Sequence, residues 1–460
     1  MIRSLHDLLV DRRHPARPSF AGLRARTEGA VLEPGDEGYD ALVTPWNVAV
    51  PVRPAGVVAA TCAQDVVASV RFARSHELTV SPQATGHGAV VGRAGSLLVN
   101  TARLDECTVH PDGWARVGAG VKWGRVVEAA AQHGLAPLSG SSSDVGVVGY
   151  TTGGGVGPMA RTYGLASDRV RAFEVVTGDG KLRRVTAVEH PDLFFALRGG
   201  KGAAGIVTAM EFELVEQPRF YGGALYFAGE DAHAVVERWR TWSQTLPVDG
   251  TTSLACLQLP PLPFVPPPLA GRFTVAVRYL WTGDAASGEA QLAGMRAAAP
   301  VVLDSIGEMP YAAVDAVHAD PVEPMPVHEA TTVLSSFTYE TSRALLAAAG
   351  PESGSPQVVV EVRQLGGALG TGTDAADAYC HRDAAYNVLT VGIGGQPGVC
   401  DHAADVVKAL DPWSTGGVLP NFGSATPQEI YDLDTLTRLR AVVRRYDPSR
   451  VLALGRLLEA

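Results

Sequence analysis

The residues of this 460-residue chain that are best suited to chemistry lie in two glycine-rich stretches. The first runs from Pro82 to Ala89 and places a single histidine, His87, between two glycines. A turn with so little side-chain bulk lets successive backbone N–H groups converge on an anion such as a phosphate. The spacing fits neither a P-loop nor the GxGxxG pattern of dinucleotide-binding folds. A histidine between glycines is usually an ordinary loop residue, so this stretch needs support from others.

The second stretch, Gly140–Gly157, contains three consecutive glycines at positions 153–155. Consecutive glycines cost conformational entropy and add nothing to a hydrophobic core. They are useful where the backbone must come close to a flat ligand. The alternative is a flexible surface loop, and the apolar residues around the glycines argue against it: Val145, Val147, Val148 and Val156.

The composition excludes several classes of protein. Apolar residues make up 46% of the chain, which is ordinary for a globular protein and excludes a largely disordered one. A formal net charge of −10 argues against nucleic-acid binding and against attraction to anionic membranes, since both need a basic surface. The five cysteines are widely spaced without a CxxC pair, so we expect neither disulfides nor a metal site. No apolar run suits a signal peptide or a membrane span, so we expect a cytoplasmic protein.

Helices and short strands alternate in the first half of the chain and should position both glycine-rich stretches. Apolar residues at helical spacing from Asp65 predict a helix, followed by a strand at 78–80 and a turn at 81–90. Gly178-Asp-Gly180 lies between two strand-like runs and predicts a hairpin. In the second half the pattern predicts strands at 253–259, 273–281, 358–365 and 385–392, and helices at 239–246, 288–298 and 433–443.

The ordered set of motifs resembles the berberine bridge enzyme-like flavoproteins of the vanillyl-alcohol oxidase superfamily, which have a PCMH-type FAD-binding domain. The resemblance implies an α+β fold with an FAD-binding domain at 1–217 and a substrate-binding domain at 218–400, built on a large antiparallel sheet covered by helices. A C-terminal segment, 401–460, would pack back on the FAD domain. The motifs that carry the resemblance span nearly the whole chain: Thr85–Gly88, Val145–Gly157, Arg161–Asp168, Asp192–Gly200, Gly205–Thr208, Gln364–Ala368, His381–Tyr386, Asn421–Phe422 and Tyr446–Pro448.

The resemblance also implies where FAD would lie. In the family, the histidine at the position of His87 is bonded covalently to the 8α-methyl carbon of the flavin. The turn from Gln83 to Ala89 would hold the pyrophosphate, Ile206 would meet the adenine through its backbone, and Asn421 would lie beside the isoalloxazine ring. The residues expected to contact the cofactor are Gln83, Ala84, Thr85, Gly86, His87, Gly88, Ala89, Val145, Gly146, Gly149, Gly153, Gly154, Gly157, Ile206 and Asn421.

This chain departs from the family at the second attachment point. Many members add a bond from a cysteine to the flavin, and the corresponding residue here is Ser142. A serine hydroxyl cannot form that bond, so we expect covalent attachment through His87 only.

The resemblance implies hydride transfer from substrate to flavin, but the usual proton acceptor is absent. Sugar- and alcohol-oxidising relatives carry a tyrosine two residues before Asn421, and this chain has Leu419 there. A plant branch uses a glutamate at a position that falls near Asp374. Tyr386, His381 and Tyr339 are other candidates, and a neutral amine substrate would need no base. For each of these residues a purely structural role is the more common one.

Two further features concern the substrate. Arg363 and Gln364 lie on the expected strand 358–365, which faces the substrate in the family. Since alternate residues of a strand point to opposite faces, only one of the two can reach a pocket there. The proline-rich run Pro260–Pro268, with Phe264, is either a rigid surface connector or a cap over that pocket.

Together these features predict an FAD-dependent oxidase of a small or secondary metabolite, such as an alcohol, a sugar, an amine or a reduced ring. Dioxygen would reoxidise the flavin to give hydrogen peroxide, and the small Val145, at the position that gates dioxygen in the family, favours an oxidase. The alternatives are a dehydrogenase that uses another acceptor, and a flavin-bearing ligand-binding or resistance protein, which the loss of the tyrosine at Leu419 keeps open. We expect a monomer or homodimer without a metal.

Overall fold

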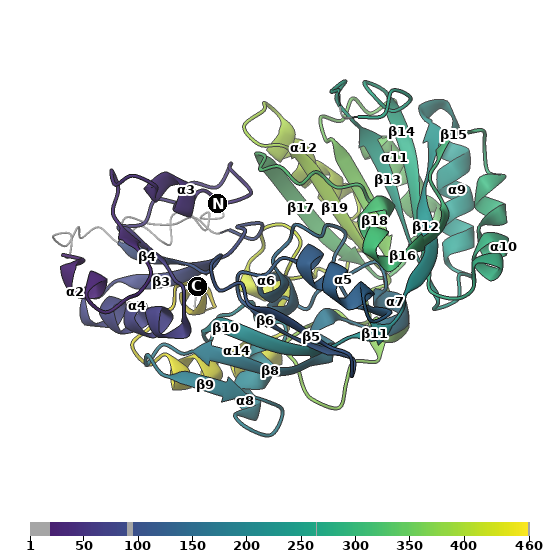
Figure 1. Ribbon diagram of the computed structural model, residues 1–460. Coiled ribbons are helices and arrows are strands. Elements are labelled where there is room, and N and C mark those ends of the chain that lie inside the picture. The colour runs from purple at the N-terminus through teal and green to yellow at the C-terminus, as the bar shows by residue number, and fades with distance from the viewer. Residues whose placement is uncertain (1–18, 90–94, 264, 459–460) are drawn as a thin grey trace.

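The computed structural model describes residues 19–89, 95–263 and 265–458, which form an α+β fold (Figure 1). The described strands build four sheets, of four, five, two and eight strands. In Figure 1 the four- and five-stranded sheets lie on the left and below, and the eight-stranded sheet lies at the upper right. The fold class predicted from the sequence, an α+β fold with a large antiparallel sheet covered by helices, is confirmed.

The four-stranded sheet carries the first glycine-rich turn. Three of its strands, β2, β4 and β3, are parallel, and helix α4 makes the crossover from β2 to β3. The helix forms because its apolar residues recur at helical spacing and bury one face. The sheet order is β1 (Val31–Leu32), β2 (Gly56–Ala59), β4 (Ser96–Asn100) and β3 (Thr79–Gln83), with α4 at Ala63–Ser75.

The five-stranded sheet is antiparallel and includes the predicted hairpin. Strands β8 and β9 pair across the turn at Gly178–Gly180, which confirms that prediction. The sheet order is β5 (Cys107–His110), β6 (Trp114–Gly118), β10 (Ile206–Glu213), β8 (Val170–Val176) and β9 (Leu182–Val185). The helices between these strands are α5 (Trp123–Ala131), α6 (Val147–Thr152), α7 (Ala160–Tyr163), η1 (Ala166–Arg169) and α8 (Pro191–Leu197).

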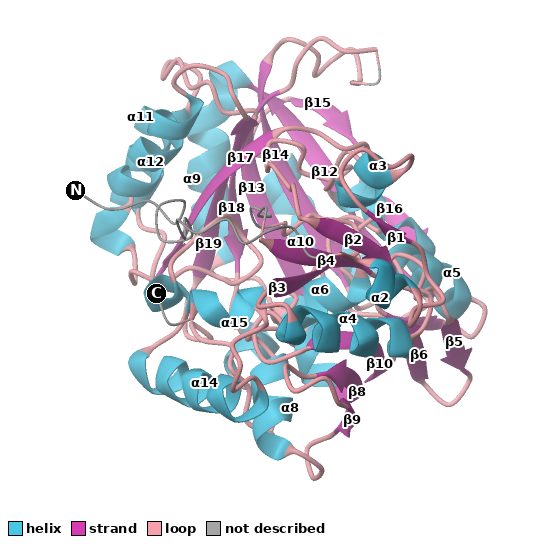
Figure 2. Ribbon diagram, turned by 90° about the vertical axis from the view of Figure 1, so that its left-hand side faces the viewer, coloured by secondary structure: helices cyan, strands magenta, loops and turns pink. Residues whose placement is uncertain are grey.

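The eight-stranded sheet is antiparallel, and helices cover one of its faces (Figure 2). Its strands follow the order β15 (Val301–Asp304), β12 (Arg219–Ala228), β14 (Phe273–Trp281), β13 (Gly250–Gln258), β18 (Val359–Gln364), β19 (Tyr386–Ile393) and β17 (Val327–Leu334), and β16 (Gly307–Pro310) also pairs with β12. The covering helices are α9 (Ala232–Ser243), α10 (Ala285–Arg296), α11 (Tyr339–Ala349) and α12 (Val399–Ala409). The four predicted strands of this half are confirmed within two or three residues.

Shorter elements connect the sheets. The remaining described elements are α2 (Ala21–Arg24), α3 (Tyr39–Val43), the strand pair β7 (Leu135–Ala136) and β11 (Val215–Glu216), η2 (Gly229–Asp231), η3 (Tyr311–Val317), η4 (Gly367–Gly370), η5 (Asp411–Trp413), α13 (Pro427–Ile430), α14 (Leu433–Tyr446) and α15 (Ala453–Leu457). None of the helices among the described residues is long and apolar enough to cross a membrane.

The end of the chain returns to the first half of the fold, as predicted. Helix α14 packs on α8, and α15 packs on β3. The Val80 N–H donates to Val451 O at 2.8 Å, which adds the end of the chain to the edge of β3. Asp447 fixes this segment by accepting the N–H groups of Val451 and Leu452. Helix α12 packs on β17 and β19 instead, so the return begins after residue 409. The domain boundaries at 217 and 400 stay predictions.

The carboxylate of Asp65 fixes the start of helix α4 to the chain before it. It accepts the N–H groups of Glu28, Gly29 and Thr61 at 2.7–3.1 Å, and the Thr61 hydroxyl at 3.0 Å. Burial alone would raise the pKa of Asp65, but these hydrogen bonds outweigh burial and lower it.

Replacing Asp65 by alanine should therefore lower the melting temperature in a pH-dependent way. Because the folded-state pKa lies below the unfolded value, the carboxylate stabilises the fold above about pH 4, and this stabilisation is lost as the pH falls through the folded-state pKa. The gap between the melting temperatures of wild type and D65A should be several degrees near neutral pH and should narrow on acidification. A gap that stays constant down to the acid limit of folding would contradict the assignment.

Candidate functional site

The first glycine-rich turn follows β3 and holds the half-buried His87 in one position. The His87 ring stacks on Trp46 with their centroids 4.6 Å apart, and its Nδ1 lies 2.8 Å from Thr85 Oγ1. Gly86 adopts a φ of +79°, and a Cβ there would lie 2.6 Å from Pro45. Only glycine allows this conformation and this close approach without strain. The turn is therefore preorganised around the imidazole.

The environment of His87 keeps its imidazole neutral. Burial lowers the pKa of His87 to about 4, and it outweighs the opposing charge of Asp144. Asp144 forms an ion pair with Lys122 at 2.5 Å, and the charge of Lys122 also lowers the His87 pKa. A neutral imidazole keeps one ring nitrogen with a free lone pair, which a bond to carbon requires.

Beyond His87 the turn presents bare backbone beside a cation. Gly88 is exposed, and a Cβ built on it would lie 3.8 Å from Lys201 Nζ. Burial lowers the pKa of Lys201 to about 8, against the opposing charge of Glu329, so the amine stays mostly protonated near neutral pH. A small cavity beneath the turn is lined by Val52, Ser81, Pro82, Gln83, Gly88, Ala89, Leu98 and Leu454. The cation and the bare backbone suit an anionic group such as a pyrophosphate.

The side chain of Gln83 does not point into the turn. Gln83 ends β3, is buried, and donates from Nε2 to Val43 O at 3.2 Å. Only its backbone remains available to a ligand of the turn, and its contact with the cofactor stays a prediction.

The two glycine-rich stretches lie against each other. A Cβ built on Gly146 would lie 3.7 Å from both Ala84 Cβ and Thr85 Oγ1. Helix α6 begins directly after Gly146, and its exposed Gly149 has open space where a Cβ would be. This surface of bare backbone beside the His87 turn can accept a flat group.

Three other glycines of the second stretch serve contacts within the chain. A Cβ on Gly153 would lie 2.0 Å from Asn421 Oδ1, and one on Gly157 would lie 2.0 Å from Ser139 O. A Cβ on Gly154 would lie 2.4 Å from the Tyr379 ring. The sequence analysis expected these glycines to line the flavin. In the structure, other residues of the chain lie so close to these three glycines that a side chain would not fit, whether or not a flavin is bound.

Replacing Gly153 by alanine should displace Asn421. The Asn421 Nδ2 donates to Tyr150 O at 2.7 Å, and the added methyl group would break this contact. We expect G153A to lose about 1–3 kcal/mol, a fall of several degrees in melting temperature. The matched control is G294A on α10, where a Cβ has open space, and this change should be neutral or stabilising by up to about 1 kcal/mol. Equal melting temperatures for the two variants would contradict the clash.

The remaining predicted cofactor contacts lie on neighbouring elements. The Val145 carbonyl accepts the N–H of Trp123 at 3.0 Å, so the peptide at this position is fixed to the start of α5. Ile206 is the buried first residue of β10 and pairs with Val176 on β8. The Ser142 hydroxyl accepts the Asp144 N–H at 3.3 Å. Their contacts with FAD remain predictions.

A row of polar side chains crosses the face of the eight-stranded sheet that is opposite to the covering helices. Ser253 on β13 pairs with Arg278 on β14 and with Arg363 on β18, so the three side chains stand side by side. Glu361, two residues before Arg363, shares this face because side chains alternate along a strand. Arg278 Nη1 donates to Glu361 Oε1 at 2.7 Å, and Arg363 Nη2 donates to Oε2 at 3.0 Å.

His318 completes this cluster from the end of η3. Its Nε2 lies 3.3 Å from Arg363 Nη2 and 3.5 Å from Glu361 Oε1. Burial lowers the pKa of His318, the hydrogen bond to Glu361 opposes this, and the charges of Arg278 and Arg363 add to it, so the ring is neutral near neutral pH. We call Arg278, Glu361, Arg363 and His318 the basic cluster.

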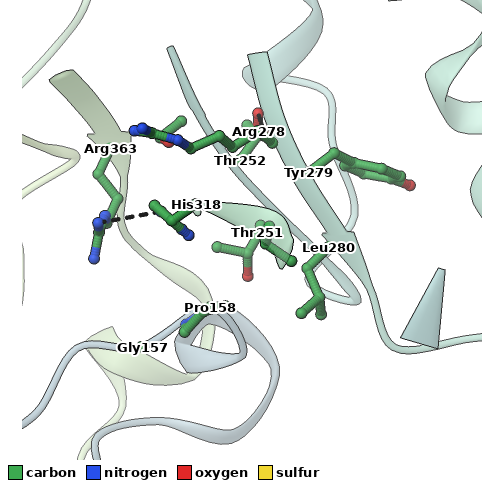
Figure 3. A pocket seen from close by; sticks show the side chains of 11 residues that line it. Gly157, Pro158, Thr251, Thr252, Arg278, Tyr279, Leu280, His318 and Arg363 are labelled. Carbon is green, nitrogen blue, oxygen red and sulfur yellow. Dashed lines mark hydrogen bonds between the residues drawn. The ribbon is translucent and has the colours of Figure 1, made fainter. Parts of the chain in front are cut away.

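The basic cluster adjoins a cavity that also touches the second glycine-rich stretch. Figure 3 shows His318 between Arg363 and Thr251, with Gly157 and Pro158 below them. Arg363 also lies over the ring of Phe422, 5.5 Å from its centroid, and Phe422 follows Asn421. The cavity therefore joins the sheet to the residues that the sequence analysis placed beside the flavin.

The structure separates the four predicted catalytic residues. Arg363 faces the cavity, whereas Gln364 and Tyr386 lie on the helix-covered face. Gln364 Nε2 donates to Ser243 O at 2.5 Å, and Tyr386 packs against Trp239 at 5.9 Å between ring centroids. Asp374 is exposed on the loop after η4 and has no hydrogen bond or ion pair to another described residue. The expectation that only one of residues 363 and 364 reaches the pocket agrees with this geometry. Gln364, Tyr386 and Asp374 do not line this cavity, and their catalytic roles stay predictions.

Two alternative bases are also outside the cavity. His381 Nε2 lies 3.0 Å from Glu429 O, where it holds a loop. Tyr339 is 50% exposed at the start of α11, on the helix-covered side of the sheet. Leu419, which replaces the usual tyrosine, is buried in an apolar cluster.

Three residues of the basic cluster were not predicted from the sequence: Arg278, Glu361 and His318. Glu361 could have been found, because a carboxylate two residues before Arg363 on an otherwise apolar strand shares its face. Arg278 and His318 could not, since their positions depend on the register of the sheet and on the path of η3.

Comparisons with known proteins support an FAD site in this part of the fold. The family model described as "FAD binding domain" matches residues 54–186, which include both glycine-rich stretches. The chain is 34% identical over 195 residues to the (R)-6-hydroxynicotine oxidase of Paenarthrobacter nicotinovorans, a match that covers 42% of this chain and 43% of that protein. It is 33% identical over 224 residues to the FAD-linked oxidoreductase sorD of Penicillium rubens, covering 47% of each. These matches span less than half the length of either relative.

The whole fold is similar to that of solved flavoproteins. The crystal structure of 6-hydroxy-D-nicotine oxidase from Arthrobacter nicotinovorans superposes with a TM-score of 0.81 at 25% identity, over 93% of this chain and 97% of that chain. The berberine bridge enzyme-like protein 1 of Physcomitrella patens gives a TM-score of 0.81 at 18% identity, over 95% and 98%. The fold and the site define an FAD-binding protein. Residues 54–186 therefore match an FAD-binding domain, and the chain as a whole has the fold of these solved flavoproteins.

The residues present fit FAD. The neutral imidazole of His87, the bare backbone at Gly88 and Gly149, and the amine of Lys201 lie within one continuous region. An imidazole can bond to the flavin ring, the open glycines can accept a planar group, and the amine can balance a phosphate.

Proposed function

We infer that this protein is an FAD-dependent oxidase of a small or secondary metabolite. FAD, when bound, accepts a hydride at N5 from a substrate C–H next to oxygen or nitrogen, and dioxygen then reoxidises it with release of hydrogen peroxide. The observation that carries the proposal is the neutral, preorganised His87 turn packed on the second glycine-rich stretch, inside the region that matches the FAD-binding family.

The chain's own residues would fix the cofactor and the substrate. His87 would hold the flavin covalently, Lys201 would balance the pyrophosphate, and Asn421 would lie at the ring through its contact with Gly153. Arg363 would reach the substrate from the sheet, with the cavity walls excluding water from the reacting carbon. The small side chain of Val145 would leave room for dioxygen.

The proposal is tested by peroxide release. The purified protein is incubated in air with a library of alcohols, sugars, amines and polyketides, and hydrogen peroxide is measured with a coupled peroxidase. At least one compound class should give sustained peroxide formation and should bleach the flavin absorbance under anaerobic conditions. Bleaching without peroxide would favour a dehydrogenase that uses another acceptor.

Leu419 supports one alternative. Because a buried leucine stands where relatives carry a proton-accepting tyrosine, the protein could bind its ligand without oxidising it. A flavin that no library compound bleaches would favour this ligand-binding or resistance function over the oxidase.

A further inference from the structure

The geometry points to a carboxylate-binding subsite in the cavity at the basic cluster, and so to small organic acids as the substrate class. This inference deepens the proposed function and rests on it for the reaction, but not for binding. It depends on two observations: the charge balance of the cluster, and its donors without partners.

The basic cluster carries one more positive than negative charge. Arg278 and Arg363 are each 7% exposed and share a single carboxylate, Glu361, which is 4% exposed. His318 contributes no charge because its ring is neutral. Asp320 is the next acidic group and acts on Arg278 only through space, without an ion-pair contact. A buried excess charge is costly unless an anion balances it.

Two guanidinium donors of the cluster have no hydrogen-bond partner among the described residues. Arg278 Nε and Arg363 Nε are buried and have none, and neither has the buried Nδ1 of His318, which is a donor or an acceptor according to the tautomer. Such donors are costly to leave without partners. A carboxylate has two oxygens that can accept from guanidinium groups at the same time, so it suits this arrangement better than a neutral carbonyl does.

A group of buried apolar side chains continues from the basic cluster along the same face of the sheet. Leu257 follows Ser253 at alternate positions of β13, and Tyr226 packs with Leu257 beneath Val265 and Leu269. Val265 belongs to the proline-rich run, and Leu269 follows that run directly. Phe264, which the sequence placed in a possible cap, lies outside the described residues. Because these apolar side chains bury one another and none of them lines the cavity, the feature of the ligand that the site selects is its carboxylate.

The subsite is joined to the expected flavin position. Gly157 and Pro158, at the end of the second glycine-rich stretch, line the same cavity as His318 and Arg363. A carboxylate held there would orient a carbon of the ligand toward Asn421 and its neighbours. The basic cluster would thus position the substrate and take no proton from it.

The test measures binding by the protein as purified, without turnover. Isothermal titration calorimetry compares benzoate and hexanoate with their neutral isosteres benzamide and hexanamide. Each carboxylate should bind roughly tenfold or more tightly than its amide. The variants are R363M, R278M and E361Q, with R219M as the matched control, because Arg219 is exposed and pairs with Glu308 at 3.1 Å on the edge of the same sheet.

The variants should change affinity in opposite directions. R363M and R278M should weaken benzoate binding roughly tenfold, E361Q should tighten it because it removes the competing negative charge, and R219M should leave it unchanged. The double variant E361Q/R363M removes both partners of one ion pair and replaces R363M if that variant fails to fold. If the cluster only stabilised the fold, E361Q would weaken benzoate binding, as R363M and R278M do.

Two results would overturn the inference: carboxylates that bind no more tightly than their amides, or weaker carboxylate binding by E361Q. The outcome is separate from that of the oxidase proposal. Carboxylate binding without any peroxide-forming substrate would retain this subsite and remove the oxidase. Peroxide formation from neutral compounds, with no preference for carboxylates, would retain the oxidase proposal and remove the carboxylate subsite.

Discussion

Replacing His87 by alanine should abolish the flavin fluorescence of the denatured protein. On an acid-treated denaturing gel, wild type should give a fluorescent band, because a covalent bond survives denaturation, and H87A should fall to background. The physical reason is that alanine offers no nucleophilic nitrogen, whereas His87 is held neutral by burial and fixed between Trp46 and Thr85. H87A can still bind FAD non-covalently through the rest of the site, so its native protein can remain yellow.

The matched control is S142A. Ser142 stands where relatives carry a second attachment residue, and among the described residues its hydroxyl accepts only the N–H of Asp144. S142A should keep the full fluorescence of wild type. A fluorescent H87A band, or a band that S142A alone removes, would place the attachment elsewhere on the chain.

Local patterns were enough to predict several elements of this fold, although four strands of the eight-stranded sheet were not predicted. Strand β14 alternates over residues 273–281, the tripeptide Gly178–Gly180 closes a hairpin, and α4 shows a single apolar stripe. Each of these depends on residues within about ten positions of one another, where periodicity is decisive. The observed boundaries differ from the predicted ones where tertiary contacts extend an element. The strand predicted at 78–80 continues as β3 to Gln83 because it pairs with β4 as far as Asn100.

The candidate site could be predicted only where it is local. His87 and its turn are one short segment, so residue types marked them as candidates, and the predicted attachment to the flavin came from the family resemblance. The basic cluster is built across β13, β14, β18 and η3, and its members meet only because Ser253 pairs with both Arg278 and Arg363. The glycines show another limit of prediction from sequence. Gly153 and Gly157 were expected to contact the flavin, whereas in the structure their close neighbours are Asn421 and Ser139. A single sequence indicates that a position must be small, but not which group approaches it.

Replacing Arg161 by methionine should cause the largest loss of stability among the single changes considered. Arg161, on α7, is buried and donates to three carbonyls of the eight-stranded half: Nε to Gly250 O at 2.8 Å, Nη1 to Leu365 O at 2.6 Å and Nη2 to Leu246 O at 2.9 Å. Methionine keeps much of the volume but leaves the carbonyls without these donors. We expect a loss of about 3–5 kcal/mol and a fall in melting temperature of roughly 5 °C or more.

The change at Arg161 should also loosen the contact between the two halves of the fold, because its three acceptors lie at the ends of α9, β13 and β18 while α7 follows the second glycine-rich stretch. Thermal unfolding, monitored by circular dichroism, measures the loss of stability. Flavin fluorescence of the native protein, recorded during heating, reports whether the cofactor is released before the chain unfolds. R219M is the control, because an exposed ion pair contributes at most about 1 kcal/mol. If R161M and R219M unfold at the same temperature, the three hydrogen bonds do not hold the halves together, and the cavity between them must be fixed by apolar packing alone.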